Sequence, residues 1–137
     1  MKKLYLVSLL LLWVCTIGEG ASVALGWDVH CDNQVAGYVV YYGPPAAVAR
    51  TNVIAAYTND CGVYMPTTTN VYRGNYTNTV YVTGRTNTTT TITNLVNGAT
   101  YCIALVARTD IGVESDLSNE LSFTVPLKRP KSLLLSD

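Results

Sequence analysis

Histidine is almost absent from this 137-residue chain, which carries one copy, His30. Nucleophilic catalysis needs a nucleophile, a base and an orienting group within reach of one another. No Gly-x-Ser-x-Gly turn occurs, and Glu114 and Asp116 stand two residues apart in a predicted turn. The sequence therefore predicts a non-catalytic protein without a cofactor.

Metal-binding residues are also scarce. Asp28, His30, Cys31 and Asp32 stand close together, but a zinc site usually takes three or four ligands from two separated segments. No second cluster of such residues occurs in the sequence. We therefore expect no metal site and interpret this segment as a solvated turn that can carry a disulfide.

Charge is sparse and balanced, since charged residues make up 13% of the chain and nine basic residues offset nine acidic ones. A nucleic-acid-binding protein normally carries a basic stripe that neutralises phosphates, and none occurs here. The longest apolar run, residues 4–14, is shorter than the roughly twenty residues that a transmembrane helix needs. We expect no nucleic-acid partner and no transmembrane segment in the mature chain.

The first twenty residues have the pattern of a signal peptide. Lys2 and Lys3 precede the apolar run, and Gly18 and Gly20 place small residues before a cut at Ala21. The sequence predicts a cleavable signal peptide over residues 1–20 and a secreted or periplasmic protein. Disulfides are permitted in that compartment.

The rest of the chain alternates with the two-residue period of β-strands and shows no helical period. The predicted strands cover residues 22–27, 37–42, 79–83, 88–93, 101–108 and 120–125. Several short strands with frequent turn signals between them predict an all-β antiparallel sandwich.

Four segments carry a resemblance to fibronectin type III domains. Residues 23–28 and 35–43 resemble strands B and C of that family. Residues 95–101 resemble its Leu-x-Pro-Gly-x-x-Tyr turn into strand F, with Asn97 in place of the proline. Residues 112–126 are similar to the last turn and strand G of bacterial exported members. The resemblance implies an immunoglobulin-like β-sandwich over residues 21–126, followed by a tail.

The resemblance also implies which residues form the core: Trp27, Tyr38, Leu95 and Tyr101. Trp27 is large enough to fill the space between two sheets. Tyr101 stands where the family has a tyrosine corner, in which the hydroxyl bonds to backbone a few residues upstream. We expect residues 127–137 to form a flexible tail, with a short docking segment as the alternative.

The chain departs from the family at two places. We expect the family's first strand to be missing or very short, because the predicted signal peptide ends almost where strand B begins. Residues 44–73 form an insertion after strand C, and a loop of about thirty residues usually has structure or a function of its own. Residues 51–57 and 71–72 could form a hairpin within it.

The insertion and the hairpin after it are the predicted binding surface. Tyrosines recur there among threonines and asparagines, and tyrosine supplies contact area at little cost in entropy. These tyrosines are Tyr57, Tyr64, Tyr72, Tyr76 and Tyr81. The alternative is ordinary strand composition, in which tyrosine and threonine are common.

The outer face of strands C and F is predicted to be apolar. By alternation, Val39, Tyr41, Cys102 and Val106 point away from the core. An apolar patch of this kind is usually covered. We favour the insertion as its cover, and a partner chain is the alternative.

Three cysteines remain in the predicted mature chain. Cys31 lies in the B–C turn and Cys102 begins strand F at the opposite end, so their Cα atoms cannot approach to the roughly 5–6 Å of a disulfide. Cys61 in the insertion reaches Cys31 if residues 51–57 return beside strand C, and otherwise meets Cys102. We favour Cys31–Cys61, and three free thiols remain an alternative.

Together these features predict a secreted, non-catalytic binding or adhesion module. Its Tyr/Thr/Asn-rich surface would bind a protein or a polysaccharide. The alternative is a structural or accessory subunit of a cell-surface or virion assembly, packed through the outer face of strands C and F.

Overall fold

A computed structural model of the chain describes residues 9–16, 20–59 and 61–128, with side chains from residue 20 onward. All regular elements in these ranges are strands. They are β1 (Leu9–Thr16), β2 (Ala21–Trp27), β3 (Val35–Gly43), β4 (Pro45–Ile54), β5 (Tyr57–Thr58), β6 (Tyr64–Met65), β7 (Thr68–Gly74), β8 (Asn78–Thr83), β9 (Thr89–Leu95), β10 (Thr100–Thr109) and β11 (Leu121–Thr124).

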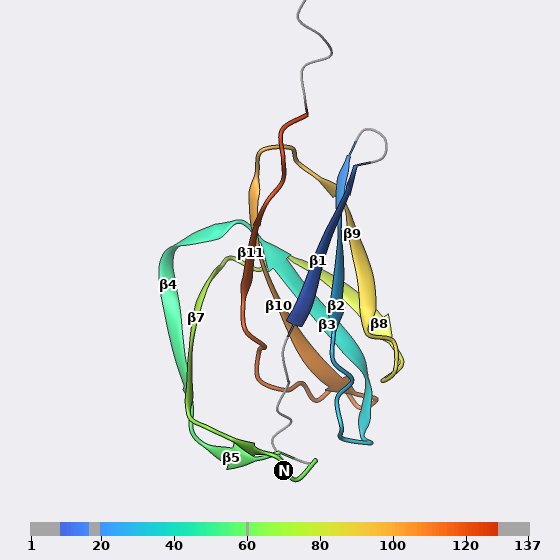
Figure 1. Ribbon diagram of the computed structural model, residues 1–137, viewed down its shortest axis with the longest axis vertical. Helices are drawn as coiled ribbons and strands as arrows, with labels where there is room; N and C mark the ends of the chain where they lie inside the picture. The colour runs from blue at the N-terminus through green and yellow to red at the C-terminus, as the bar shows by residue number, and fades with distance from the viewer. Residues whose placement is uncertain (1–8, 17–19, 60, 129–137) are drawn as a thin grey trace, which may run out of the picture.

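Two antiparallel sheets form the sandwich (Figure 1). One has the order β1-β2-β9 and the other β11-β10-β3-β8. In β2, buried residues alternate with half-buried ones, as expected of a strand with one face on a core. The predicted antiparallel sandwich is confirmed, and each of the six predicted strand ranges overlaps one of its strands.

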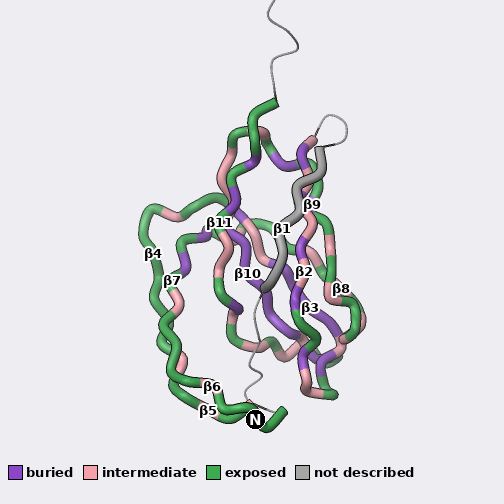
Figure 2. The backbone as a smooth tube through the Cα atoms, in the orientation of Figure 1, coloured by how far each residue is buried: buried purple, intermediate pink, exposed green. Residues whose placement is uncertain are grey.

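The core lies between the two sheets and includes Ile103, Leu105 and Ala107 of β10. β10 is buried continuously from Cys102 to Ala107, because its outer face is covered as well (Figure 2). β10 pairs with β3 on one side and β11 on the other. Trp27 and Tyr38 meet in the core, with ring centroids 5.3 Å apart in an edge-to-face arrangement. Leu95 is buried in the same cluster.

Tyr101 forms the tyrosine corner that the sequence predicts. Its hydroxyl accepts a hydrogen bond from the backbone N–H of Val96, 3.2 Å away and five residues upstream. Gly98 occupies the turn between them with a φ of +78°, a conformation that glycine adopts without strain. This corner fixes the connection from β9 to β10.

Replacing Tyr101 by phenylalanine tests the corner. The ring remains and only the hydrogen bond to Val96 is lost, so we expect the free energy of unfolding to fall by about 1 kcal/mol. Urea denaturation followed by circular dichroism measures this change. Tyr64→Phe is the control, because that side chain is 67% exposed. Equal midpoints for the two variants would contradict the role of the hydroxyl.

β1 corrects the expectation of a missing first strand. It lies at the outer edge of its sheet and pairs antiparallel with β2, from Leu9 opposite Trp27 to Thr16 opposite Ala21. A short apolar run is typical of a signal peptide and also of a buried strand, and the periodicity of the sequence does not distinguish the two. Cleavage of residues 1–20 stays a prediction. Residues 1–8, 17–19 and 129–137 of the predicted signal peptide and tail lie outside the described residues.

The insertion folds as a long two-stranded arm, residues 45–74. Strands β4 and β7 pair antiparallel along it, and the short β5–β6 pair lies at its tip. The arm begins at one end of the sandwich, where Asn75 N–H donates to the carbonyl of Pro44 (2.8 Å). Its tip lies at the other end (Figure 1). The predicted hairpin is thus present, with longer strands than the sequence indicated.

A disulfide between Cys31 and Cys61 attaches the tip of the arm to the β2–β3 turn. The two Cα atoms are 5.7 Å apart. The pairing that the sequence analysis favoured is therefore confirmed. Among the cysteines whose side chains are described, Cys102 is the free one, and burial raises the pKa of its thiol. A buried thiol of this kind is chemically inert.

Candidate binding cleft

The outer face of β3 and β10 is covered by the chain itself. Val39, Cys102 and Val106 are at most 3% exposed, whereas Tyr41 stays partly exposed. Tyr72 of the arm is buried, and its hydroxyl donates to the carbonyl of Leu117 (3.0 Å). Three of the four residues predicted for a partner contact are thus inaccessible in this structure. The structural-subunit alternative stays a prediction, with Tyr41 as the one of these four residues that is partly exposed.

Glu120 attaches the base of the arm to the sandwich. One carboxylate oxygen accepts the N–H of Arg73 (2.7 Å) and the other accepts the N–H of Gly74 (2.8 Å). The second oxygen also accepts the hydroxyl of Tyr76. Burial and then Glu120 raise the pKa of Tyr76 well above its ordinary value. These three hydrogen bonds hold one carboxylate against two backbone groups and a ring.

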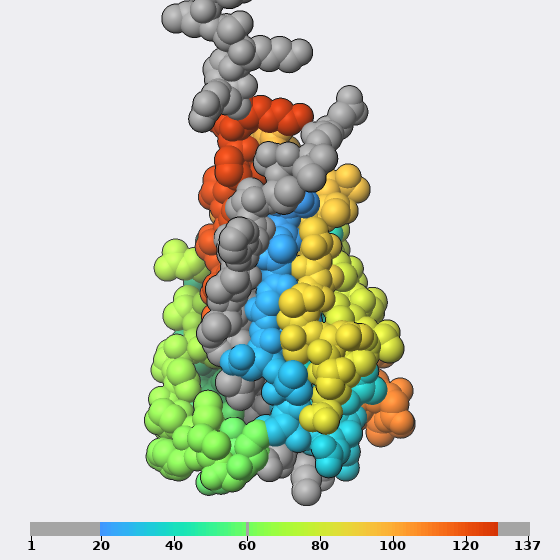
Figure 3. Space-filling model, turned by 45° about the vertical axis from the view of Figure 1, so that its right-hand side comes forward, coloured from blue at the N-terminus to red at the C-terminus, as the bar shows by residue number. Residues whose placement is uncertain are grey.

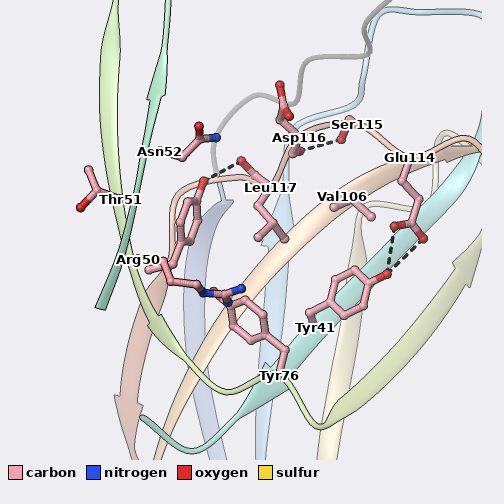
Figure 4. A pocket seen from close by; sticks show the side chains of 11 residues that line it. Tyr41, Arg50, Thr51, Asn52, Tyr76, Val106, Glu114, Ser115, Asp116 and Leu117 are labelled. Carbon is pink, nitrogen blue, oxygen red and sulfur yellow. Dashed lines mark hydrogen bonds between the residues drawn. The ribbon is translucent and has the colours of Figure 1, made fainter. Parts of the chain in front are cut away.

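A cleft of about 530 Å³ lies between the arm and the outer face (Figure 4). The arm supplies one wall, β3 and β10 supply the floor, and the segment before β11 supplies the other wall. The lining residues are Tyr41, Arg50, Thr51, Asn52, Tyr72, Tyr76, Val106, Glu114, Ser115, Asp116 and Leu117. The cleft therefore exists because the arm turns back over the sheet instead of extending into solvent.

Aromatic rings and charges meet within the cleft. The rings of Tyr41 and Tyr76 are 6.3 Å apart and tilted by 45°. The Arg50 guanidinium lies 5.8 Å from the centre of the Tyr76 ring, within the range of a cation–π contact. Figure 4 shows the Tyr41 hydroxyl turned toward Glu114, and both carboxylate oxygens accept from it (3.0 and 3.1 Å). The two tyrosines are thus held in place by carboxylates.

The same contacts change the titration of Tyr41. Burial, followed by the hydrogen bond and the negative charge of Glu114, raises its pKa to about 12. The folded state therefore binds this proton more tightly than the unfolded chain does. The resulting stability is fully present below about pH 10 and is lost as the pH rises through 12. Tyr72 and Tyr76 shift in the same direction, mainly through burial.

We expect the melting temperature to fall between pH 10 and 12. Tyr41→Phe removes one of the shifted groups, so its melting temperature should fall less steeply over that range. Differential scanning calorimetry in steps of half a pH unit measures both slopes. Parallel curves for the two proteins would show that Tyr41 titrates as it does in the unfolded chain.

The structure separates the five tyrosines predicted for binding. Tyr72 and Tyr76 line the cleft with Tyr41, which the sequence placed in the partner contact. Tyr57 and Tyr64 lie on the short strands at the tip of the arm. Tyr81 lies on β8, 64% exposed, with the Arg108 guanidinium 5.5 Å from the centre of its ring. These tyrosines therefore occupy three regions and not one surface.

Several cleft residues were not predicted. Arg50 and Asn52 lie on the arm. Glu120 contacts Arg73, Gly74 and Tyr76, which precede it in the sequence by 47, 46 and 44 positions. Glu114 and Asp116 were considered only as carboxylates in a turn. Charged residues are rare in this chain, so a charged side chain near the predicted outer face was the one feature of the sequence that could have indicated these cleft residues.

His30 has a structural role in the β2–β3 turn. The backbone N–H of His30 donates to the Tyr38 hydroxyl (2.9 Å), and the imidazole Nδ1 of His30 accepts the backbone N–H of Asp32 (3.1 Å). The Tyr38 hydroxyl in turn donates to the carbonyl of Arg85 (2.8 Å). Within the described part of the chain, no group of three or more His, Cys, Asp or Glu side chains could hold a metal. In the same residues, no helix has the length and apolar character that a membrane span requires.

Comparison with known proteins bears on the fold alone. No protein-family model and no curated protein matches the sequence. The chain is similar to a solved structure described as a myokine, with a TM-score of 0.50 and 14% identity over 91% of this chain and 99% of that one. It is also similar to the third fibronectin III domain of the human KIAA0343 protein, with a TM-score of 0.52 and 14% identity over 96% and 90% of the two chains. The chain has the fibronectin type III fold, as the sequence resemblance implied.

Proposed function

We propose that this protein is an exported, non-catalytic binding module whose cleft holds a short segment of a carbohydrate chain. The cleft between the arm and the sandwich carries this proposal. Its volume of about 530 Å³ lies within the roughly 300–1,000 Å³ that is usual for ligand sites. A typical protein partner instead needs a contact of about 800 Å² on each side.

The chemistry of the lining favours a neutral, hydroxyl-rich ligand. The faces of Tyr41 and Tyr76 offer apolar area against which the C–H groups of a sugar ring can pack. Thr51 and Asn52 add groups that can both donate to and accept from a hydroxyl, and Asp116 adds a carboxylate that accepts from one. The lining carries one basic side chain, Arg50, and two acidic ones, Glu114 and Asp116, so it disfavours an anionic ligand.

The carboxylates near this cleft favour binding over catalysis. Both oxygens of Glu114 are occupied by the Tyr41 hydroxyl, and Glu120 is occupied by the base of the arm. These carboxylates thus position tyrosines and backbone. Export rests on the signal-peptide pattern, and the Cys31–Cys61 disulfide suits an oxidising compartment.

Retention on insoluble polysaccharide tests the proposal. Arg50 and Asn52 are exposed on the cleft side of the arm, so Arg50→Ala with Asn52→Ala should fold normally and weaken retention about tenfold. Thr69→Ala is the matched control, since Thr69 is exposed on the arm but does not line the cleft. Unchanged retention by the double variant would exclude the cleft. An equal loss with Tyr64→Ala would move the site to the tip of the arm.

A further inference from the structure

β8 is an edge strand of the larger sheet. It pairs with β3 over six residue pairs, from Asn78 opposite Tyr42 to Thr83 opposite Gly37, and among the described strands β3 is its one partner. Figure 3 shows β8 (yellow-green) beside β9 (yellow) at one margin of the molecule. An unpaired edge presents N–H and C=O groups that another strand can bind. β8 is therefore a position at which this sheet can be extended.

The ladder with β3 determines which backbone groups of β8 are directed outward. The Gly84 N–H donates to the carbonyl of Ala36 (2.8 Å), and this pair continues the register of the β3–β8 ladder. Hydrogen-bonded and non-hydrogen-bonded pairs alternate along an antiparallel ladder. The N–H and C=O groups of Thr79, Tyr81 and Thr83 are therefore directed away from β3.

β8 lacks the features that usually keep an edge strand from pairing. Charged side chains, proline and β-bulges have this effect. The six residues of β8, NTVYVT, include no charge and no proline, and their register with β3 has no bulge. The exposed strand β4 of the arm differs, because it contains Pro45, Arg50 and a register shift between them. The edge of β8 is thus open to another strand, whereas the edge of β4 is protected.

We propose that β8 pairs antiparallel with β8 of a second copy of this chain, with Tyr81 on the two-fold axis. In this register the two Tyr81 residues lie opposite each other. Thr79 then lies opposite Thr83 of the second copy, and Val80 lies opposite Val82. Each pair matches in polarity, and no like charges are opposed. Because the strand complements itself, a second copy is favoured over a different chain, and two four-stranded sheets become one continuous sheet.

The outward backbone groups fit this register. The two Tyr81 residues would exchange their N–H and C=O groups, as a hydrogen-bonded pair of an antiparallel ladder does. The Thr83 N–H would donate to the Thr79 carbonyl of the second copy. The Asn87 side chain donates to the Thr83 carbonyl (2.6 Å), which agrees with the outward direction of that carbonyl. Pairing would thus use groups that point away from β3 in the single chain.

The side chains of β8 would also gain from this pairing. Val80 and Val82 pack against the core but are only half-buried. A second copy would cover both valines at the rim of the core. On the outer face Tyr81 is 64% exposed, and aromatic cross-strand pairs stabilise antiparallel strands. One strand pair is a smaller contact than the usual 800 Å² or so per side, so we expect a weak dimer with a Kd of about 10–100 μM.

Sedimentation equilibrium of the full chain, from about 5 to 500 μM, tests the proposal. We expect the unchanged chain to dimerise, and Tyr81→Lys and Tyr81→Glu each to weaken the dimer about tenfold, because like charges would then lie opposite each other. An equimolar mixture of the two variants should associate again, since opposite charges then meet at the axis. Thr69→Lys is the matched control, because Thr69 is exposed on the arm. Circular dichroism verifies the fold of each variant.

Three results would overturn the proposal. A monomer at about 500 μM would mean that the edge of β8 does not bind a second copy. A dimer of unchanged affinity in both Tyr81 variants would place the contact elsewhere on the molecule. A mixture of the two variants that stays monomeric would remove Tyr81 from the axis. Tyr81 does not line the cleft, and Arg50→Ala with Asn52→Ala should dimerise normally, so failure of this proposal and failure of the cleft proposal are distinguishable.

Discussion

Replacing Cys31 and Cys61 by serine should lower the free energy of unfolding by about 3–4 kcal/mol. The disulfide closes a loop with a sequence separation of 30, and the loss of this constraint frees the unfolded chain. The same substitutions should also disrupt the cleft. Glu120 holds the base of the arm, but the disulfide is the covalent attachment of its tip. Without it, the wall that carries Arg50 and Asn52 is no longer fixed, and retention on polysaccharide should be lost.

Chemical denaturation with and without a reductant measures this effect. The reductant should destabilise the unchanged protein to the level of the double serine variant and should leave that variant unaffected. The buried thiol of Cys102 is the internal control, because it is outside the disulfide in both proteins. A double variant with the original midpoint and full retention would show that noncovalent contacts alone position the arm.

Replacing Trp27 by alanine should destabilise the protein by about 3–5 kcal/mol, the range for removing a large buried ring. Trp27 is 5% exposed and packs edge-to-face on Tyr38, so its removal leaves a cavity between the two sheets. Thermal denaturation followed by circular dichroism measures the loss.

Trp27→Phe separates packing from hydrogen bonding. The indole Nε1 has no hydrogen-bond partner among the described residues, so phenylalanine removes volume without breaking a bond. We expect this variant to lose less than half as much stability as Trp27→Ala. Equal losses would show that the indole nitrogen makes an essential contact.

The sandwich could be predicted because its signals are local. The alternation of β2 follows from the one face that it turns to the core, and the apolar run of β10 follows from burial on both of its faces. Tyr101 was identifiable because its partner, Val96, lies five residues upstream within one turn. β1 was not predicted, because an apolar run of its length is typical of both a signal peptide and a buried strand.

The cleft could not be predicted because it depends on contacts distant in sequence. The sequence showed the length of the insertion and left two courses open for it. The choice between them is made by Cys31 and Cys61 at the tip and by Glu120 at the base. Tyr41 illustrates the consequence, since alternation placed it correctly on the outer face but could not show what would lie across from it.

The attachment of the arm at both ends also affects how the domain would behave under mechanical tension. The bond between Cys31 and Cys61 closes a ring that contains β3 and the first half of the arm. A force applied at the two chain ends passes through the disulfide and bypasses the residues inside this ring. About 100 Å of extended chain, at about 3.4 Å per residue, therefore cannot be drawn out even when the sheets have separated. A module built in this way would yield less length under load than the same fold without the bond.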